Sequence, residues 1–254
     1  MQLELLGTGS AGGMPLFGCP CAACEQARQN PKLSRESACA RISHGEQSIL
    51  IDAGLSDLHR RYGSADLSHM LLTHFHMDHV QGLFPLRWGR DAKIKVIGPD
   101  DPKGADDLFK HPGILDFSTK AHAFEPFPLA GMTITPLPLN HSRPTLGYVF
   151  EADGQRMAYL TDTLGLPEGT EDWLKMHPCD ILVVDCSFPP TPSPRNHNDL
   201  GEALRIIEIS RAKQGVLTHI SDRMALWLLE HEAELPGHVR AAHDGMLLRP
   251  ADAA

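Results

Sequence analysis

The residues of this chain best suited to chemistry are those at positions 73–79, which read Thr-His-Phe-His-Met-Asp-His and follow the apolar residues 70–72. Side chains alternate along a strand, so His74 and His76 lie on one side of a strand end. Asp78 and His79 can face the same point from the turn that follows. This spacing gives two adjacent sets of ligands and favours two divalent ions over one. A pair of such ions is typical of hydrolases.

A scaffold of apolar strands must position these side chains. Strands are predicted at residues 3–6, 38–43, 48–52, 70–73 and 94–97, and in a second half at 132–136, 146–151, 156–161, 181–184 and 215–218. Helices are predicted at residues 80–88, 104–109, 199–211 and 224–230, the third with Asp199 as its cap and Glu202 completing a capping box. This order predicts an α/β fold of two packed mixed sheets with helices outside, in one domain of 254 residues.

Residues of metal-ligand type recur directly after the predicted apolar strands. They are Asp52, His74, His141, Asp162 and His219. Loops at one edge of a rigid scaffold are where functional sites are assembled. The sequence therefore predicts that these residues meet in one site, where Asp52 supports a ligand histidine from behind.

Charge and hydropathy narrow the range of partners. The formal net charge is −9, and no run of lysine and arginine is present, which argues against a large nucleic acid held on a basic face. The first ten residues lack the basic and apolar regions of a signal peptide, and no stretch is apolar enough to span a membrane. We therefore expect a cytoplasmic protein with a small-molecule substrate.

Three cysteines follow the pattern Cys-x-Cys-x-x-Cys at Cys19, Cys21 and Cys24. In a chain without a secretion signal, this spacing is typical of three thiolates that bind a structural Zn²⁺. The alternative is three reduced thiols that bind no metal. A small zinc-binding segment at residues 19–24 is the prediction.

The run His-x-His-x-Asp-His with a later His, Asp and His resembles the metallo-β-lactamase superfamily, which folds as an αββα sandwich. The resemblance implies a dinuclear site in which one ion is bound by His74, His76 and His141, the other by Asp78, His79 and His219, and both by Asp162. A bridging carboxylate with nitrogen and oxygen ligands suits Mn²⁺ or another divalent ion. Two such ions with two carboxylates and a hydroxide leave a local charge of about +1, which favours an anionic substrate.

Further segments resemble a narrower group, the PhnP family of phosphodiesterases from the carbon–phosphorus lyase pathway. The similar segments are residues 7–9, 15, 19–24, 79–89, 107–113, 136–142 and 195–197. The resemblance implies that the substrate is 5-phospho-α-D-ribose 1,2-cyclic phosphate, opened to α-D-ribose 1,5-bisphosphate in phosphonate catabolism. It also implies a homodimer.

The sequence departs from this family at one zinc ligand. In the family, the fourth ligand is a histidine three residues after the last histidine of the dinuclear site, and here that position is Asp222. A site of three thiolates and one carboxylate is therefore expected. Because a carboxylate is a harder ligand than an imidazole, its affinity for Zn²⁺ should be lower.

Several residues are candidates for the chemical step. Asp78 is expected to orient the attacking water, and His197 is the candidate general acid, because an imidazole that binds no metal can move protons near neutral pH. The alternative for His197 is a solvated loop residue, and the resemblance favours the catalytic role. Candidate donors to the 5-phosphate are Arg195, Asn196, Ser142 and Arg143.

Other functions are compatible with parts of these motifs. A tRNA 3′-processing nuclease has the same metal motif, but it needs a basic arm that the sequence does not show. Glyoxalase II or a lactonase would not explain the cysteine triplet. A protein of cofactor biosynthesis without phosphodiesterase activity, similar to the relative in the pyrroloquinoline-quinone pathway, shares the cysteine pattern.

Overall fold

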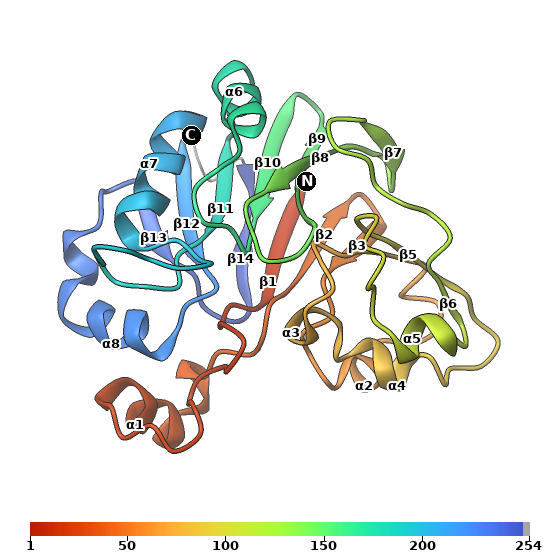
Figure 1. The fold of residues 1–254 in the computed structure, drawn as a ribbon, viewed down its shortest axis with the longest axis horizontal. Helices are drawn as coiled ribbons and strands as arrows, with labels where there is room; N and C mark the ends of the chain where they lie inside the picture. The colour runs from red at the N-terminus through yellow and green to blue at the C-terminus, as the bar shows by residue number, and fades with distance from the viewer. Residues whose placement is uncertain (251–254) are drawn as a thin grey trace.

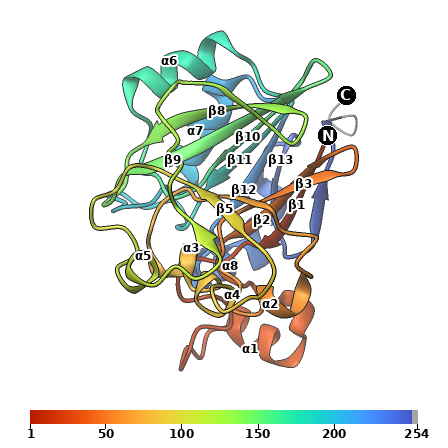
Figure 2. The same cartoon turned by 90° about the vertical axis from the view of Figure 1, so that its right-hand side faces the viewer.

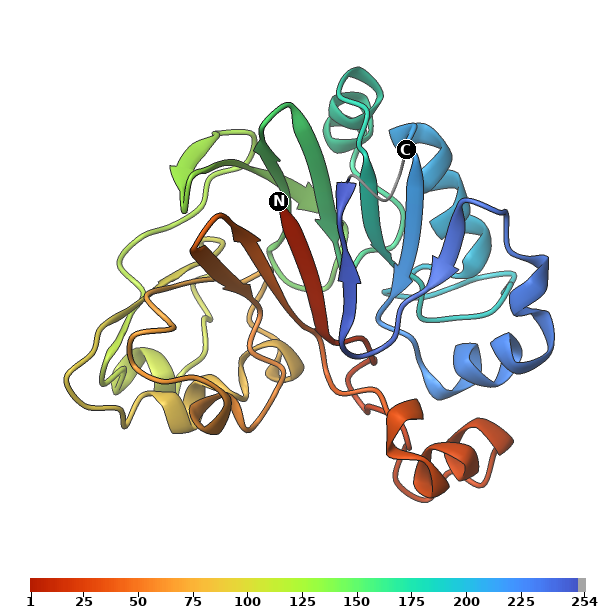
Figure 3. The same cartoon turned by 180° about the vertical axis from the view of Figure 1, so that it is seen from behind.

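Two seven-stranded sheets carry the fold of residues 1–250, the part of the chain that the computed structural model describes (Figure 1). The first sheet has the order β14 (Met246–Leu248), β1 (Gln2–Gly7), β2 (Cys39–His44), β3 (Gln47–Ile51), β4 (His69–Leu71), β5 (Ile94–Ile97) and β6 (Leu115–Asp116). Its first four strands are antiparallel neighbours, and β3 to β6 are parallel. Seen from behind, β1 and β14 lie side by side in the middle of the molecule (Figure 3).

The second sheet mirrors this arrangement. Its order is β13 (Val239–Ala241), β12 (Gln214–Thr218), β11 (Ile181–Asp185), β10 (Gln155–Leu160), β9 (Thr145–Ala152), β8 (Met132–Leu139) and β7 (Phe127–Leu129). Strands β10 to β13 are parallel, whereas β7 to β10 are antiparallel neighbours. Parallel and antiparallel pairs in both sheets confirm the predicted mixed sheets.

Apolar residues from both sheets form the core between them. Leu3 and Ile42 of the first sheet share this core with Tyr148, Tyr159 and Val216 of the second. In β1, apolar and polar residues alternate, and this pattern directs one face of the strand into the core. Leu3 and Leu5 are fully buried, while Gln2 and Glu4 are partly exposed. The fold expected from the sequence, two packed sheets, is confirmed.

Helices cover the outer faces of the two sheets (Figure 1). The second sheet is covered by α6 (Glu168–Met176), α7 (Leu200–Ser210) and α8 (Asp222–His231), and the first by α2 (Leu58–Arg61), α3 (Met77–Val80), α4 (Leu83–Leu86) and α5 (Asp107–Lys110). Helix α1 (Ala22–Gln29) lies below the strands and packs against α8, as Figure 2 also shows. Two single 3₁₀ turns, η1 (Pro31–Leu33) and η2 (Glu232–Glu234), follow α1 and α8. Within residues 1–250, none of the helices is long and apolar enough to cross a membrane.

Two local expectations need correction. The helix expected over residues 80–88 is two short helices, because the backbone N–H of Gly82 donates to the carbonyl of Ala53 and leaves the helical ladder. A Cβ at Gly82 would lie 2.2 Å from the carbonyl oxygen of Leu55, so only glycine allows this approach. Asp199 caps α7 as expected, but the Glu202 side chain binds Arg205 and does not complete a capping box.

Candidate metal centre

The candidate ligands gather at the carboxyl ends of the strands. Asp52 follows β3, Asp162 follows β10 and His219 follows β12, all at the edge where parallel strands leave open loops. These three residues share a left-handed backbone, with φ angles of 61°, 62° and 58°. Such angles are uncommon outside glycine and are concentrated at functional sites. The backbone thus turns each side chain sharply off its strand and toward one point.

A first group of ligand atoms comes from His74, His76, His141 and Asp162, all within 4.8 Å of one another. The Nε2 atoms of His74 and His141 lie 2.9 and 3.0 Å from Nδ1 of His76. The Asp162 Oδ2 atom lies 3.7 Å from both of those Nε2 atoms. Three ring nitrogens and a carboxylate oxygen that face one point are a donor set for a divalent ion.

A second group comes from Asp78, His79, His219 and the same Asp162. Nε2 of His79 lies 3.4 Å from Asp78 Oδ2 and 3.3 Å from Asp162 Oδ2. Nε2 of His219 lies 3.6 Å from Asp78 Oδ2 and 3.4 Å from Asp162 Oδ1. Asp162 therefore belongs to both groups and turns one oxygen toward His219 and the other toward the remaining histidines. That is the position of a bridging carboxylate.

Two buried nitrogen atoms show that the centre fits metal ions. Nε2 of His79 and Nε2 of His219 are shielded from solvent and have no hydrogen-bond partner among the described residues. The opposite nitrogen of each ring is held, His79 Nδ1 by Asp52 Oδ2 at 2.8 Å and His219 Nδ1 by the Ser187 hydroxyl at 2.9 Å. A buried polar atom without a partner is costly, and a carboxylate or hydroxyl behind a ligand imidazole is the usual support for a metal.

Electrostatics of the cluster depend on Asp162. Burial opposes the charge of His219, but Asp162, Asp78 and Asp185 together outweigh it and raise the pKa of His219 to about 9. Burial likewise acts against His79, whose pKa is nevertheless raised well above its usual range by Asp162 and Asp52. His74 differs, because burial there lowers the pKa of the imidazole well below its usual value.

These pKa shifts predict that metal uptake releases protons. Without metal, His219 holds a proton at pH 7, because its pKa of about 9 lies above that pH, and the raised pKa of His79 favours its charged form as well, whereas a ligand imidazole must be neutral. We expect about one to two protons released per chain on loading at pH 7, and apparent metal affinity that rises with pH until about 9. Titration calorimetry in buffers of different ionisation enthalpy measures this release. Loading without proton release at pH 7 would contradict the protonated state of these two histidines.

A third histidine arrangement lies beside the two ligand groups. His197 Nδ1 is 2.8 Å from Oδ2 of the fully buried Asp185, and its ring stacks on that of His219 with centroids 4.7 Å apart. Asp185 also accepts hydrogen bonds from the Thr163 backbone and the Ser187 hydroxyl. His197 is thus an imidazole fixed by a buried carboxylate and placed against the centre.

The sequence of the chain also matches a known protein family whose members can be compared with this centre. Residues 47–220 match the model of the β-lactamase superfamily domain. The chain belongs to the β-lactamase superfamily. That stretch contains β3 to β12 and every candidate ligand of the two groups that share Asp162.

Similar proteins in the superfamily carry different names. An octanoyltransferase of Porphyromonas gingivalis is 30% identical over 260 residues, which cover 97% of this chain but only 51% of that protein, so the chain spans about half its length. A coenzyme PQQ synthesis protein B of Methylobacterium radiotolerans is 28% identical over 223 residues, covering 73% of this chain and 72% of that one. A crystal structure of a diphosphatase from the PhnP family superposes with a TM-score of 0.81 at 26% identity, covering 98% of this chain and 97% of that one. The superfamily match and the similarity to the diphosphatase structure support a metal-dependent hydrolase.

Two of the four expected phosphate donors lie at the centre. The Ser142 hydroxyl is 3.4 Å from His76 Nε2. Asn196 has a left-handed backbone with φ of 65°, and its carbonyl oxygen accepts from His141 Nδ1 at 3.1 Å. Arg195, next to Asn196, is exposed.

The structure gives Arg143 a different position from the expected one. Its guanidinium donates to Asp101 Oδ2 at 2.8 Å, to the carbonyl of Phe75 at 2.7 Å and to that of Gly104 at 2.9 Å. Phe75 lies between His74 and His76, so Arg143 braces the loop that presents both histidines. These bonds engage the guanidinium with protein acceptors, and a contact of Arg143 with the 5-phosphate stays a prediction.

Asp185 and Ser187 are two residues of the centre that were not predicted from the sequence. A signal for Asp185 exists, since it ends the apolar strand β11 in the same way that Asp52 and Asp162 follow theirs. Ser187 has no comparable signal, because its role depends on the approach of His219 from the next strand.

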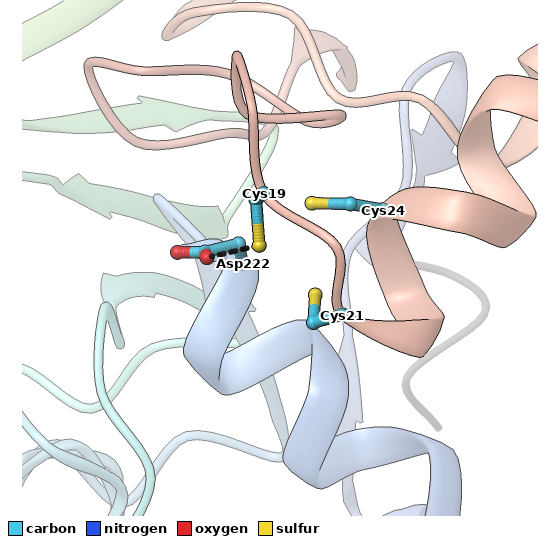
Figure 4. A group of neighbouring side chains, drawn as sticks. All are labelled: Cys19, Cys21, Cys24 and Asp222. Carbon is cyan, nitrogen blue, oxygen red and sulfur yellow. Dashed lines mark hydrogen bonds between the residues drawn. The ribbon is translucent and has the colours of Figure 1, made fainter.

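The three cysteines form a second cluster with Asp222 (Figure 4). The ligand atoms of the four residues lie within 4.8 Å of one another, and the Cys19 thiol donates to Asp222 Oδ2 at 3.2 Å. Cys24 accepts the backbone N–H of Leu16 at 3.3 Å, and none of these thiols forms a disulfide. Three thiols and a carboxylate facing one point fit a tetrahedral Zn²⁺.

Proposed function

We propose that the chain hydrolyses 5-phospho-α-D-ribose 1,2-cyclic phosphate to α-D-ribose 1,5-bisphosphate in phosphonate catabolism. The observation that carries this proposal is the pair of His197 and Asp185 beside two ligand groups that share Asp162. Cleavage of a phosphodiester needs a charged centre for the phosphate, an attacking water and a proton for the leaving oxygen. The arrangement provides a place for each.

Two Mn²⁺ or similar divalent ions held by the two groups would supply a water of lowered pKa and offset the negative charge of the phosphate. Asp78 is the ligand-type carboxylate that keeps some contact with solvent, with 13% of its side chain exposed, whereas Asp162 is 2% exposed. Asp78 is therefore the residue placed to accept a hydrogen bond from the attacking water and to orient it.

His197 is placed to protonate the leaving oxygen. Its Nδ1 is bound to Asp185, which leaves Nε2 for the substrate. As the bond between phosphorus and the ribose 2-oxygen breaks, Nε2 of the imidazolium gives its proton to that oxygen. The water oxygen remains on phosphorus, and the product keeps its 1-phosphate. Asp185 holds the ring in one orientation through its hydrogen bond with Nδ1.

The local charge differs from the value of about +1 expected from the sequence. Two further carboxylates, Asp52 and Asp185, are fully buried in contact with His79 and His197. Including them removes the positive excess of the centre. Attraction of an anion would then rest on direct contact with bound ions and on hydrogen-bond donors around the centre, for which Ser142 and the exposed Arg195 are candidates.

The test of this proposal compares substrates of the competing functions at equal metal loading. We expect initial rates on the ribose cyclic phosphate to exceed those on a precursor tRNA with a 3′ extension and on S-lactoylglutathione by at least about 100-fold, because a positioned general acid contributes on that order. Faster cleavage of the tRNA would identify a processing nuclease. No turnover of any ester by the loaded protein would favour a cofactor-biosynthesis role, as named for coenzyme PQQ synthesis protein B.

We also propose that Cys19, Cys21, Cys24 and Asp222 bind one structural Zn²⁺. Asp222 is the first residue of α8, and α1 follows Cys21, so the ion would tie the two helices together. We expect Asp222→Ala to lower zinc content and the melting temperature while the dinuclear ligands stay in place. Asp222→His should raise zinc affinity, because imidazole is a softer ligand than carboxylate. Metal analysis and thermal unfolding measure both effects, and unchanged zinc in Asp222→Ala would place the fourth ligand elsewhere.

A further inference from the structure

A groove of about 690 Å³ lies between α1, η1 and α8. Helices α1 and α8 are at the lower side of the molecule in Figure 1. Its volume falls in the range of small-molecule sites, about 300–1,000 Å³. Among the residues that the structure describes, none of the candidate ligands of either metal cluster lines it. The groove is therefore a separate feature, which the proposed reaction does not use.

Small apolar side chains form the wall of this groove. Ala23 of α1 and Ala225 of α8 face it together with Leu228, and all three are buried. Leu33 and Leu229 stand at its rim with 43% and 48% of their surface exposed. Covering these exposed side chains with an apolar ligand is favourable, in proportion to the apolar area removed from water.

Arg35 provides a cation at the groove. Its Nη1 donates to the Thr8 hydroxyl at 2.9 Å and to the Ala242 carbonyl at 2.5 Å. The remaining edge of the guanidinium, formed by Nε and Nη2, makes no hydrogen bond within residues 1–250, and Nε is shielded from solvent. Because Nε is shielded and Nη2 is not, Nη2 is the donor that a carboxylate oxygen in the groove can reach.

No carboxylate within residues 1–250 pairs with Arg35 at 4 Å or less. The nearby Asp244 is already engaged, since its oxygens accept from the backbone and hydroxyl of Thr8 and from the backbone of Glu36. Burial lowers the pKa of Arg35 more than Asp244 and Glu232 raise it. A shielded cation without a paired anion is unfavourable, so the groove lacks one partner.

We propose that this groove binds a carboxylate that carries an apolar chain, such as the anion of a medium-chain fatty acid. The carboxylate would meet Nη2 of Arg35, and the chain would run along Ala225 and Leu228 toward Leu229. Glu230 and Glu232 also line the groove and disfavour a more highly charged anion such as phosphate.

Calorimetric titration of the metal-loaded protein with decanoate and with 1-decanol, both below the concentration at which they aggregate, tests this inference. We expect decanoate to bind at least about tenfold more tightly than 1-decanol, because a hydrogen-bonded charge contributes about that much. Arg35→Gln should abolish the difference between the two ligands. Leu229→Asp, at an exposed position where folding is not at risk, should weaken both at least about fivefold, the effect of losing part of one buried side chain.

Lys32→Gln is the matched control, because Lys32 lines the groove and is exposed, with no ion pair among the described residues. It should change the affinity for decanoate less than about twofold, as expected for a screened surface charge. Absence of saturable decanoate binding would overturn the inference. Equal binding by wild type, Arg35→Gln and Leu229→Asp would also overturn it, since the ligand would then bind elsewhere on the protein.

Discussion

Asp162→Asn should remove metal and activity together. The carboxylate of Asp162 lies within 3.7 Å of His74 and His141, and within 3.4 Å of His79 and His219. Asparagine keeps the shape and tolerates the left-handed backbone, but it removes the negative charge between four imidazoles. We expect metal content to fall by at least one ion per chain and kcat/KM to fall more than about 100-fold, the upper end for residues that only support ligands.

The matched control for this prediction is Asp153→Asn. Asp153 also has a left-handed backbone, with φ of 53°, but 74% of its side chain is exposed. Its substitution should leave metal content and turnover unchanged. Elemental analysis and steady-state kinetics on both variants decide the matter. Wild-type metal content and turnover in Asp162→Asn would mean that Asp162 does not bridge the two groups.

His197→Gln should abolish most turnover and leave the metals in place. His197 contacts Asp185 and stacks on the ring of His219, but it belongs neither to the group of His74, His76, His141 and Asp162 nor to the group of Asp78, His79, His219 and Asp162. Loss of a positioned general acid typically costs on the order of 10²–10⁴-fold in rate. We expect a loss of that size on the cyclic phosphate, with unchanged metal analysis.

The activity of His197→Gln on esters with different leaving groups shows whether His197 acts as a general acid or only supports the structure. A p-nitrophenyl phosphodiester releases a phenolate that needs no proton, so His197→Gln should lose much less activity on that ester. His122→Gln, at an exposed position, is the control and should behave as wild type on both esters. An equal loss of activity on both esters, or a loss of bound metal, would mean that His197 has a structural role in the centre and is not the general acid.

Much of the centre could be predicted from the sequence because its ligands follow apolar strands. Five such residues, from Asp52 to His219, are separated by up to 167 positions, yet parallel strands bring their carboxyl ends to one edge. The His-x-His-x-Asp-His segment added local spacing that only a metal site explains. For the same reason the two sheets could be predicted, since their buried strands carry continuous apolar runs.

The remaining features depend on contacts that sequence spacing does not encode. Arg143 stands two residues after His141, yet its position is set by Asp101, which is 42 residues away. The role of Asp185 depends on its hydrogen bond with His197, which lies on a proline-rich loop that follows β11. Helix α6 has two buried side chains, Thr170 and Leu174, so its apolar periodicity is too weak to predict it.

The most direct test of the central proposal is ³¹P NMR of the Mn²⁺-loaded protein with 5-phospho-α-D-ribose 1,2-cyclic phosphate in ¹⁸O-enriched water. Attack of water at phosphorus and loss of the ribose 2-oxygen predict conversion to α-D-ribose 1,5-bisphosphate, with the heavy isotope in the 1-phosphate. An unchanged spectrum from protein with its metals bound would contradict the proposed phosphodiesterase and leave the metal centre in need of another reaction.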